Sequence, residues 1–360
     1  MKHPNEPASV FKYQQILADL TAGIASGQWA PGQKLPSEAM LVKRYATSRI
    51  TVGRALRELQ QQGMIERVAG SGSFVRGERP AAQLVFGLLI PDLGETEIFE
   101  PICRGIANAP QARGHALLWG HAGTPGSLKQ QQAIQLCRQY IERQVNGIFF
   151  APLEFEENAR EVNRRILGQL REARIPVVLL DRRPSDTPEP GRPDLVGINN
   201  HQAGYIATEH LIRQGCRKIG FMAYHGAAPT INARFAGYRD ALRDNGLQDA
   251  LAAVEGHPDA AREPLDAYVC INDRLAGELM RAFLSRKLRI PEDIRIVGID
   301  DVSYASLLPV PLTTVRQPCR AIGEAALTAM LERIERPYMP ARDILLDGEL
   351  IVRESSGVAR

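Results

Sequence analysis

From residue 84 onward, short apolar segments alternate with longer segments whose apolar residues recur at helical spacing. This alternation constrains the fold more than any other feature of the chain. Strands that alternate with helices form parallel sheets, because each right-handed crossover returns the chain to the same edge of the sheet. The sequence therefore predicts an α/β protein with a parallel core. The expected strands are residues 84–91, 115–120, 147–151, 176–180, 195–198, 218–222, 267–271, 294–299 and 314–317. The expected helices are residues 128–144, 159–173, 202–214, 231–245, 275–287 and 320–334.

A stretch rich in proline and aspartate, residues 183–193, interrupts the alternation. We interpret this stretch as a break between two parallel sheets, which predicts a body with two lobes. The expected first lobe comprises residues 84–188 and 313–338. The expected second lobe comprises residues 189–312 and 339–360.

The first 76 residues follow a different pattern, which indicates three helices and a hairpin. We expect the second helix to begin at Ser37 and the third at Thr47 or Ser48, where a side-chain oxygen can accept from free N–H groups. Two short β-branched runs follow, residues 65–68 and 73–75, on either side of a glycine-rich tip. This order of elements is typical of a winged helix-turn-helix.

Charge is concentrated in this N-terminal part. The whole chain has 44 basic and 41 acidic residues, but residues 43–57 contain five basic residues and no acidic one. The apolar positions of the third helix place Arg49, Arg54 and Arg57 on its opposite face, where arginine can donate two hydrogen bonds to guanine. This pattern favours binding to duplex DNA, with an ordinary solvated basic face as the alternative.

Four motifs strengthen the DNA interpretation. They are PGQKLPSE at 31–38, SRITV at 48–52, GMI at 63–65 and GSGSFV at 70–75. In order and spacing they closely resemble the GntR-type winged-helix domain across residues 13–75. The resemblance implies contacts with double-stranded operator DNA. The candidate DNA-binding residues are Ser37, Ser48, Arg49, Thr51 and Arg54, with Ser71, Gly72 and Ser73 at the wing.

Two positions depart from that family pattern. Ala39 and Gly53 stand where the family often has arginine, at positions that commonly contact the operator. Arg54 can substitute for the missing arginine, although it points about 100° further around the helix. We therefore expect an operator that differs from the family's usual GT…AC core. Gly53 also lowers helix propensity by about 1 kcal/mol relative to alanine.

The body carries a second resemblance, through an ordered set of short motifs that lie at 86–91, 147–150, 176–182, 215–221, 234–238, 297–301 and 311–315. Together they resemble the LacI/GalR regulatory core, which is similar to periplasmic sugar-binding proteins. The two resemblances divide the chain into a winged-helix DNA-binding domain (1–76), a linker (77–83) and an effector-binding and dimerisation domain (84–360). The complete architecture resembles the arabinose-repressor type of transcription regulator.

Candidate effector-binding residues lie where parallel sheets place ligands, just beyond the carboxyl ends of strands. Carboxylates, amides and guanidinium groups can each bond neighbouring hydroxyls, and an aromatic face can cover the C–H side of a sugar. Each residue also has an ordinary alternative, since aspartates cap helices or bridge lobes and an arginine can simply pair with an aspartate. The resemblance implies an effector site that contains Phe99, Phe155, Asp181, Arg234, Asn272 and Asp300.

The second lobe departs from the resemblance in one segment. Residues 248–266 hold two prolines and too little chain for the strand and full helix that the family usually has here. We therefore expect a helix of this lobe to be missing or reduced to a turn. Such a change can open the edge of the sheet, alter a dimer surface or change effector specificity.

Enzyme signatures are absent from the sequence. No GxGxxG follows a strand, no P-loop, GxSxG or HExxH motif occurs, and the five cysteines are scattered without a CxxC pair. We therefore expect no catalysis, no metal and no cofactor. An enzyme body, such as a pyridoxal-phosphate aminotransferase, would need a lysine in a pocket motif. The lysines of the body, Lys129, Lys218 and Lys287, lie in none.

Taken together, the sequence predicts a repressor of a carbohydrate-utilisation operon. A sugar or sugar phosphate would bind between the two lobes and change the DNA affinity of a homodimer. The alternative is an activator, or a corepressor-dependent repressor with a purine-like effector. We expect a cytoplasmic protein, because the N-terminus lacks the apolar segment of a signal peptide and no apolar run is long enough to span a membrane.

Overall fold

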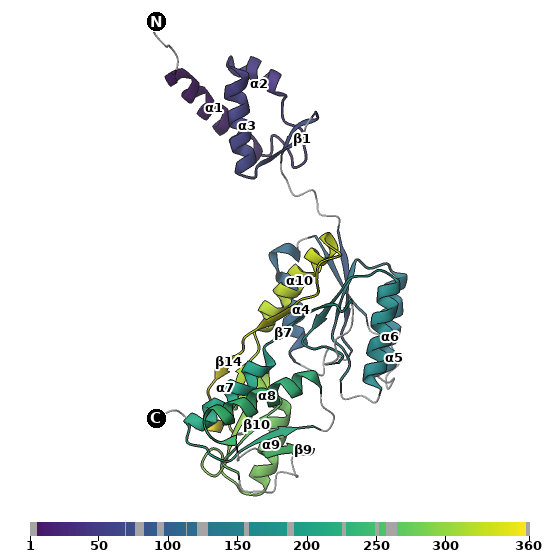
Figure 1. Cartoon of the computed structure of the whole chain (residues 1–360), viewed down its shortest axis with the longest axis vertical. Helices are drawn as coiled ribbons and strands as arrows, with labels where there is room; N and C mark the ends of the chain where they lie inside the picture. Colours follow the sequence, from purple (N-terminus) through teal and green to yellow (C-terminus); the bar gives the residue numbers. More distant parts are fainter. Residues whose placement is uncertain are drawn as a thin grey trace. The chain divides into compact units, whose positions relative to one another are not determined.

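The computed structural model (Figure 1) divides into two compact units, Met1–Gln83 and Leu84–Arg360. Of the expected linker, residues 77–82 lie outside the part of the chain that the structure describes. The side chains of residues 6–11 and 252–255 are also outside that part. The structure describes residues 6–68, 70–75, 83–91, 97–112, 114–120, 129–154, 158–185, 191–224, 228–248, 252–256 and 265–357.

The N-terminal unit, here called the head, has the predicted winged helix-turn-helix layout. Its β-hairpin is antiparallel, with Ile65 opposite Val75. The inner side of the third helix packs on the first helix, where Ile16 and Leu20 are fully buried, and this apolar core holds the three helices together. The elements of the head are α1 (Glu6–Ala25), α2 (Glu38–Tyr45), α3 (Arg49–Gln61), β1 (Ile65–Val68) and β2 (Gly72–Val75).

The C-terminal unit, here called the body, contains two six-stranded sheets. In the first sheet all neighbouring strands are parallel, in the order β13-β7-β6-β5-β3-β4. Its strands are β3 (Val85–Leu89), β4 (Ala116–Trp119), β5 (Gly147–Phe150), β6 (Val177–Leu180), β7 (Asp194–Ile198) and β13 (Asp343–Leu346). The sheet is covered on both faces, so its central strands are apolar on both sides.

Helices cover this first sheet in two pairs. Helices α4 (Phe99–Asn108) and α10 (Cys319–Glu335) lie on one face, and α5 (Lys129–Glu142) and α6 (Ala159–Glu172) lie on the other (Figure 1). A short 3-10 turn, Pro110–Ala112, follows α4. The sheet and these helices form the first lobe of the body.

The second sheet has the order β14-β12-β11-β10-β8-β9, and only its edge strand β14 is antiparallel to its neighbour. Three helices pack on it and complete the second lobe: α7 (Asn200–Arg213), α8 (Pro229–Asp244) and α9 (Asp273–Ser285). Short 3-10 turns lie at Ser303–Ser306 and Glu354–Ser356. The strands are β8 (Ile219–Ala223), β9 (Ala252–Glu255), β10 (Ala267–Cys270), β11 (Arg295–Asp300), β12 (Thr313–Arg316) and β14 (Glu349–Ile351).

Helices α7 and α8 pack closely enough to require glycine at two positions. A Cβ atom on Gly204 would lie 2.0 Å from the carbonyl oxygen of Arg234, and one on Gly237 would lie 1.9 Å from that of His201. Neither backbone can move away without separating the helices, so both glycines are needed for this contact. The contact fixes the backbone that carries Arg234.

The α/β class and the two-lobed body are confirmed, but the predicted lobe boundaries are wrong. The break was expected at 183–193, yet β7 lies after it and pairs with β6 in the first sheet, whereas β12 belongs to the second. The chain crosses between the sheets at 199, 317–318 and 347–348. Strand β7 is held in the first lobe because its buried Asp194 pairs with Arg333 of α10 at 2.8 Å.

Three strands at the edges of the sheets, β9, β13 and β14, were not predicted. Strand β13 alternates between exposed and half-buried positions, and β14 has one exposed and two half-buried residues, so neither has the continuous buried apolar run of a central strand. Strand β9 falls in the shortened segment 248–266 and forms the edge of the second sheet. The expectation that a helix here is missing or reduced to a turn concerns residues 257–264, which lie outside the described residues. In the described part of the chain, no helix has the length and apolar character needed to cross a membrane.

Candidate functional site

In the head, two serines begin the two helices that form the helix-turn-helix. The Ser37 hydroxyl accepts a hydrogen bond from the backbone N–H of Met40 at 3.3 Å, and that of Ser48 accepts from Thr51 at 3.2 Å. The Ser48 and Thr51 hydroxyls also share a hydrogen bond of 2.9 Å. Thr51 is 8% exposed, so its side chain offers little surface to a ligand. Capping leaves the other free N–H groups of each first turn available to an anion such as phosphate.

The arginines of α3 differ in their surroundings. Arg49 and Arg54 are both exposed, but the Arg54 guanidinium lies 4.6 Å from the ring centroid of Tyr13 in α1. Tyr13 in turn donates to Glu58 at 3.2 Å. Arg54 is therefore held against α1, and in this conformation it does not fill the place of the arginine missing at Gly53.

The wing presents its glycine-rich tip to solvent. Ser71 and Gly72 are exposed, whereas the Ser73 side chain is buried. The Ser73 carbonyl accepts from the N–H of Leu35 at 2.8 Å, which ties the wing to the segment before α2. Gly72 has a φ of 121°, and a Cβ atom there would lie 2.8 Å from Cε of Lys34. Glycine is thus needed where the chain enters β2.

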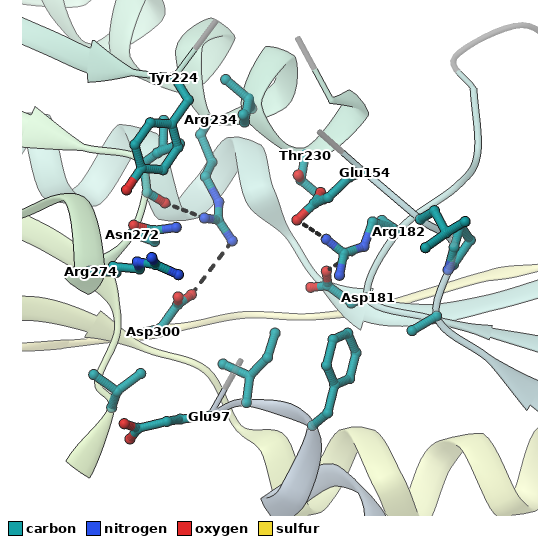
Figure 2. Close-up of a pocket in the computed structure, with 18 of the residues that line it drawn as sticks. Glu97, Glu154, Asp181, Arg182, Tyr224, Thr230, Arg234, Asn272, Arg274 and Asp300 are labelled. Carbon is teal, nitrogen blue, oxygen red and sulfur yellow. Dashed lines mark hydrogen bonds and ion pairs between the residues drawn. The ribbon is translucent and has the colours of Figure 1, made fainter. Parts of the chain in front are cut away.

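In the body, a cavity of about 490 Å³ lies between the lobes and receives side chains from both of them (Figure 2). It lies at the carboxyl ends of strands, as parallel sheets require. Five predicted effector residues line it: Phe99, Asp181, Arg234, Asn272 and Asp300. The sixth, Phe155, lies outside the described residues.

The first lobe contributes a buried guanidinium with two carboxylates. Arg182 forms an ion pair with Glu154, and its Nε lies 3.4 Å from Oδ2 of Asp181. Its guanidinium also lies 5.5 Å from the ring centroid of Phe99. Burial opposes the charged guanidinium, but attraction from Glu154 and Asp181 outweighs it and raises the pKa of Arg182. The cluster is therefore a fixed, charged wall of the cavity.

Asp181 has two features that are typical of a ligand-binding carboxylate. Its backbone adopts φ 66°, a left-handed conformation that aspartate adopts at an energetic cost. Its Oδ1 atom is buried and has no hydrogen-bond partner among the described residues. A buried carboxylate oxygen without a donor is costly, so this atom is a natural acceptor for a ligand hydroxyl.

The second lobe contributes Arg234 on the opposite side of the cavity (Figure 2). Its Nε donates to Oδ1 of Asn200 at 2.8 Å, its Nη1 donates to the carbonyl of Ile271, and its Nη2 lies 3.8 Å from Oδ1 of Asp300. The alternative in which Arg234 only pairs with Asp300 does not describe this arrangement, because two other acceptors fix the guanidinium and leave the pair with Asp300 loose.

Asp300 is the carboxylate that burial affects most clearly at this site. Its Oδ1 accepts from Nε2 of Gln317 at 2.7 Å, and its φ is 129°. Burial raises the pKa of Asp300 to about 7; Arg234 opposes this and the nearby Asp273 adds to it. Asp273 is fully buried behind it, accepts from Oγ1 of Thr314 at 2.5 Å and also has a raised pKa, mainly through burial.

Asn272 combines a structural and a ligand-facing position. Its Oδ1 accepts from the N–H of Leu275 at 2.8 Å, which caps α9. The same side chain lines the cavity. Its amide NH₂ group can therefore donate to a ligand while its oxygen holds the helix.

Two family models match the chain in its two units. The model described as "Bacterial regulatory proteins, gntR family" matches residues 12–75, and the "Periplasmic binding protein-like domain" matches residues 208–356. The chain joins a GntR-family DNA-binding domain to a periplasmic binding protein-like domain. It is hereafter called the regulator.

Among known proteins, the regulator is similar to the arabinose metabolism transcriptional repressor of Geobacillus stearothermophilus. The two are 29% identical over 96% of this chain and 97% of that protein. The PurR transcriptional repressor of Photobacterium profundum is 26% identical over 71% of this chain and 77% of that protein. A LacI-family regulator from Enterococcus faecium, solved with bound ribose, matches with a TM-score of 0.61 at 22% identity, covering 77% of this chain and all of that one.

The regulator's cavity also contains residues that sequence reasoning did not single out. Arg182 lay inside a recognised motif, directly after Asp181, but was not proposed as a site residue. Glu97 accepts from the N–H and the hydroxyl of Ser303, at 3.0 and 2.7 Å, and so joins the two lobes beside the cavity. Tyr224 donates to Glu278 at 3.2 Å. No motif marks either residue: Glu97 contacts the other lobe, and Tyr224 follows β8 and contacts α9 of its own lobe.

Proposed function

We propose that the regulator represses genes of carbohydrate utilisation and that a sugar or sugar phosphate in the body sets its DNA affinity. The observation that carries the proposal is the cavity between the lobes, where guanidinium and carboxylate groups of both lobes face one space on a chain that also has a GntR-type head. The regulator would act in the cytoplasm as a homodimer on a pseudo-palindromic operator.

The chemistry of the cavity supports a ligand rich in hydroxyl groups. Asp181 offers an acceptor without a partner, Asn272 offers an amide donor, and Arg234 offers a fixed guanidinium. A cavity of about 490 Å³ is in the range of small-molecule sites. The similarity to a repressor of arabinose metabolism, over nearly the whole of both chains, points to the same ligand class.

The coupling to DNA follows from the position of the site. A ligand that contacts both Arg182 and Arg234 binds more tightly when the lobes are close together, so it shifts the population toward the closed body. The ligand can change DNA affinity only by the ratio of its affinities for the two states of the dimer.

Thermal unfolding with candidate effectors tests the proposal. The full chain would be screened with arabinose, ribose, xylose and cellobiose, with sugar phosphates, and with hypoxanthine and guanine. A ligand at a hundredfold excess over its Kd stabilises the native state by about 2.7 kcal/mol, so a sugar should raise the Tm measurably. A shift with a purine alone would replace the sugar by a purine-like effector, and no shift with any compound would contradict an effector-binding body.

A gel-shift assay with the stabilising compound completes the test. The compound should weaken binding to a duplex that the regulator selects from a random pool. Stronger binding would instead identify a corepressor, and unchanged binding would separate the ligand site from DNA control.

A further inference from the structure

The outer face of α3 exposes an aliphatic side chain in its first turn. Ile50, the second residue of the helix, is 81% exposed. Gly53 and Arg57 share this face, three and seven residues further on, and lie opposite the buried positions. A Cβ atom on Gly53 would meet nothing within 4 Å, so the space beside Ile50 is open.

The other large apolar side chains that the described part of the head exposes are on the elements next to α3. They are Met40 of α2, which is 63% exposed, and Val68 of β1, which is 44% exposed. A helix-turn-helix places its second helix in the major groove and its first across the backbone, with the wing beside them. The described part of α1 exposes no large apolar side chain. Within the described part of the head, the exposed large apolar side chains are therefore confined to α2, α3 and β1, the elements that a winged helix-turn-helix presents to DNA.

The charge around Ile50 favours DNA over a protein partner. The described residues of α2 and α3 expose several basic side chains, which are Lys43, Arg44, Arg49, Arg54 and Arg57. Acidic side chains on these helices are only partly exposed, and Glu38 pairs with Arg67. A basic rim around an apolar centre matches the major groove, where phosphates surround base edges and the C5-methyl group of thymine is the apolar feature.

We infer that Ile50 reads the C5-methyl group of a thymine in each operator half-site. The inference rests on the proposed function, since it requires sequence-specific DNA binding. Ala39 and Gly53 carry no guanidinium, Arg54 lies on Tyr13, and Arg57 is about two helical turns further along α3. Ile50 thus recognises its base through an apolar contact with the thymine methyl group, and Arg49 makes a polar contact with a neighbouring base.

Replacing thymine with uracil removes this methyl group and nothing else, which gives a direct test. The full chain would first select duplexes from a random pool. Each thymine of a selected duplex would then be replaced by uracil, one position at a time. One position in each half-site should lose about fourfold in affinity, the value expected for one buried methyl group.

The variant Ile50→Ala identifies the residue that makes the contact. It should bind the thymine and uracil duplexes equally at that position, whereas Ile50→Val should keep part of the difference. Leu307→Ala is the matched control, because Leu307 is equally exposed, at 81%, but lies in the body, and it should keep the full difference. Thermal unfolding of each variant checks that the head remains folded.

Four results would overturn the inference, and they are distinguishable. No enrichment of any duplex would overturn the proposed function as well. Enrichment with no loss at any uracil, or a loss that Ile50→Ala retains, would overturn the methyl contact alone. A change in oligomeric state with Ile50→Ala, without a change in thymine preference, would assign Ile50 to a protein interface instead.

Discussion

The head and the body use arginine in opposite ways. In the head, Arg49 and Arg57 stand exposed on a helix. In the body, Arg182 and Arg234 are buried and face carboxylates. Exposed cations act on a polyanion through many weak, salt-sensitive contacts, whereas buried pairs are costly to break and define a precise geometry. Removal of one charge should therefore alter DNA affinity in the head, and both folding and ligand recognition in the body.

The largest expected effect follows from Arg182→Ala. The substitution leaves Glu154 and Asp181 in a buried position without their cation, which should cost about 3–5 kcal/mol of unfolding free energy. Calorimetry of the full chain should show a lower Tm for the body and no effector response. Arg104→Ala removes an exposed ion pair with Glu100 and is the control, with an expected cost of about 0.3–0.5 kcal/mol. Equal Tm changes in the two variants would remove the distinction between buried and exposed arginines of the body.

The next effect is that of Arg49→Ala in the head. Loss of a base contact should weaken binding to the selected duplex by about 1–3 kcal/mol and leave the Tm nearly unchanged. Arg54→Ala should cost less, because Arg54 already stacks on Tyr13. Titrations at several salt concentrations measure both variants. A larger loss for Arg54→Ala would show that its guanidinium leaves Tyr13 to contact DNA.

Asp300→Asn tests how a buried carboxylate of the body makes its stability depend on pH. Burial raises the pKa of Asp300 to about 7, above the ordinary aspartate value of 3.8. Between about pH 4 and pH 7 the folded body therefore binds more protons than the unfolded chain, and its stability falls as pH rises through this window. Thermal unfolding from pH 4 to pH 8 should show this decline, and Asp300→Asn should flatten it.

Effector affinity should fall in the Asp300→Asn variant while DNA binding is kept. If the dependence of Tm on pH were the same in Asp300→Asn, another group would be responsible for it, and Asp273 is the next candidate.

Gly53→Arg should have a modest effect on the stability of the head. The position is helical and open, so the substitution should stabilise the head by less than about 1 kcal/mol. It also adds a guanidinium on the face that presents Ile50, which should shift the selected duplex toward guanine at the neighbouring step. Selection from the same random pool measures the shift. An unchanged preference would show that this face does not enter the groove.

The sequence predicted the local elements well, because each has a local cause. The hydroxyls of Ser37 and Ser48 cap the helices that begin after them. The apolar sequence of β5 is typical of a strand that is buried on both faces. The cavity residues after strands, such as Asp181 and Asp300, were predictable because parallel sheets align their carboxyl ends.

The remainder depends on contacts between distant segments. Strand β7 belongs to the first sheet through its pairing with β6 and β13, and its Asp194 pairs with Arg333 and Arg342, neither of which is near it in sequence. Glu97 reaches the site only because it meets Ser303 of the other lobe. The stacking of Arg54 on Tyr13 is likewise invisible to helix periodicity, which placed Arg54 only on the outer face. Pattern reasoning describes each element by itself and cannot supply these pairings.

The close contact between α7 and α8 has a consequence for how the effector site tolerates mutation. Gly204 has no functional group and does not line the cavity, yet any side chain there would push against the backbone of Arg234. Gly237 is constrained in the same way from the other helix. A genetic selection for regulators that no longer respond to their effector should therefore return substitutions at these two glycines together with those at Arg234. Recognition of the ligand thus depends partly on two positions at which only a hydrogen atom fits.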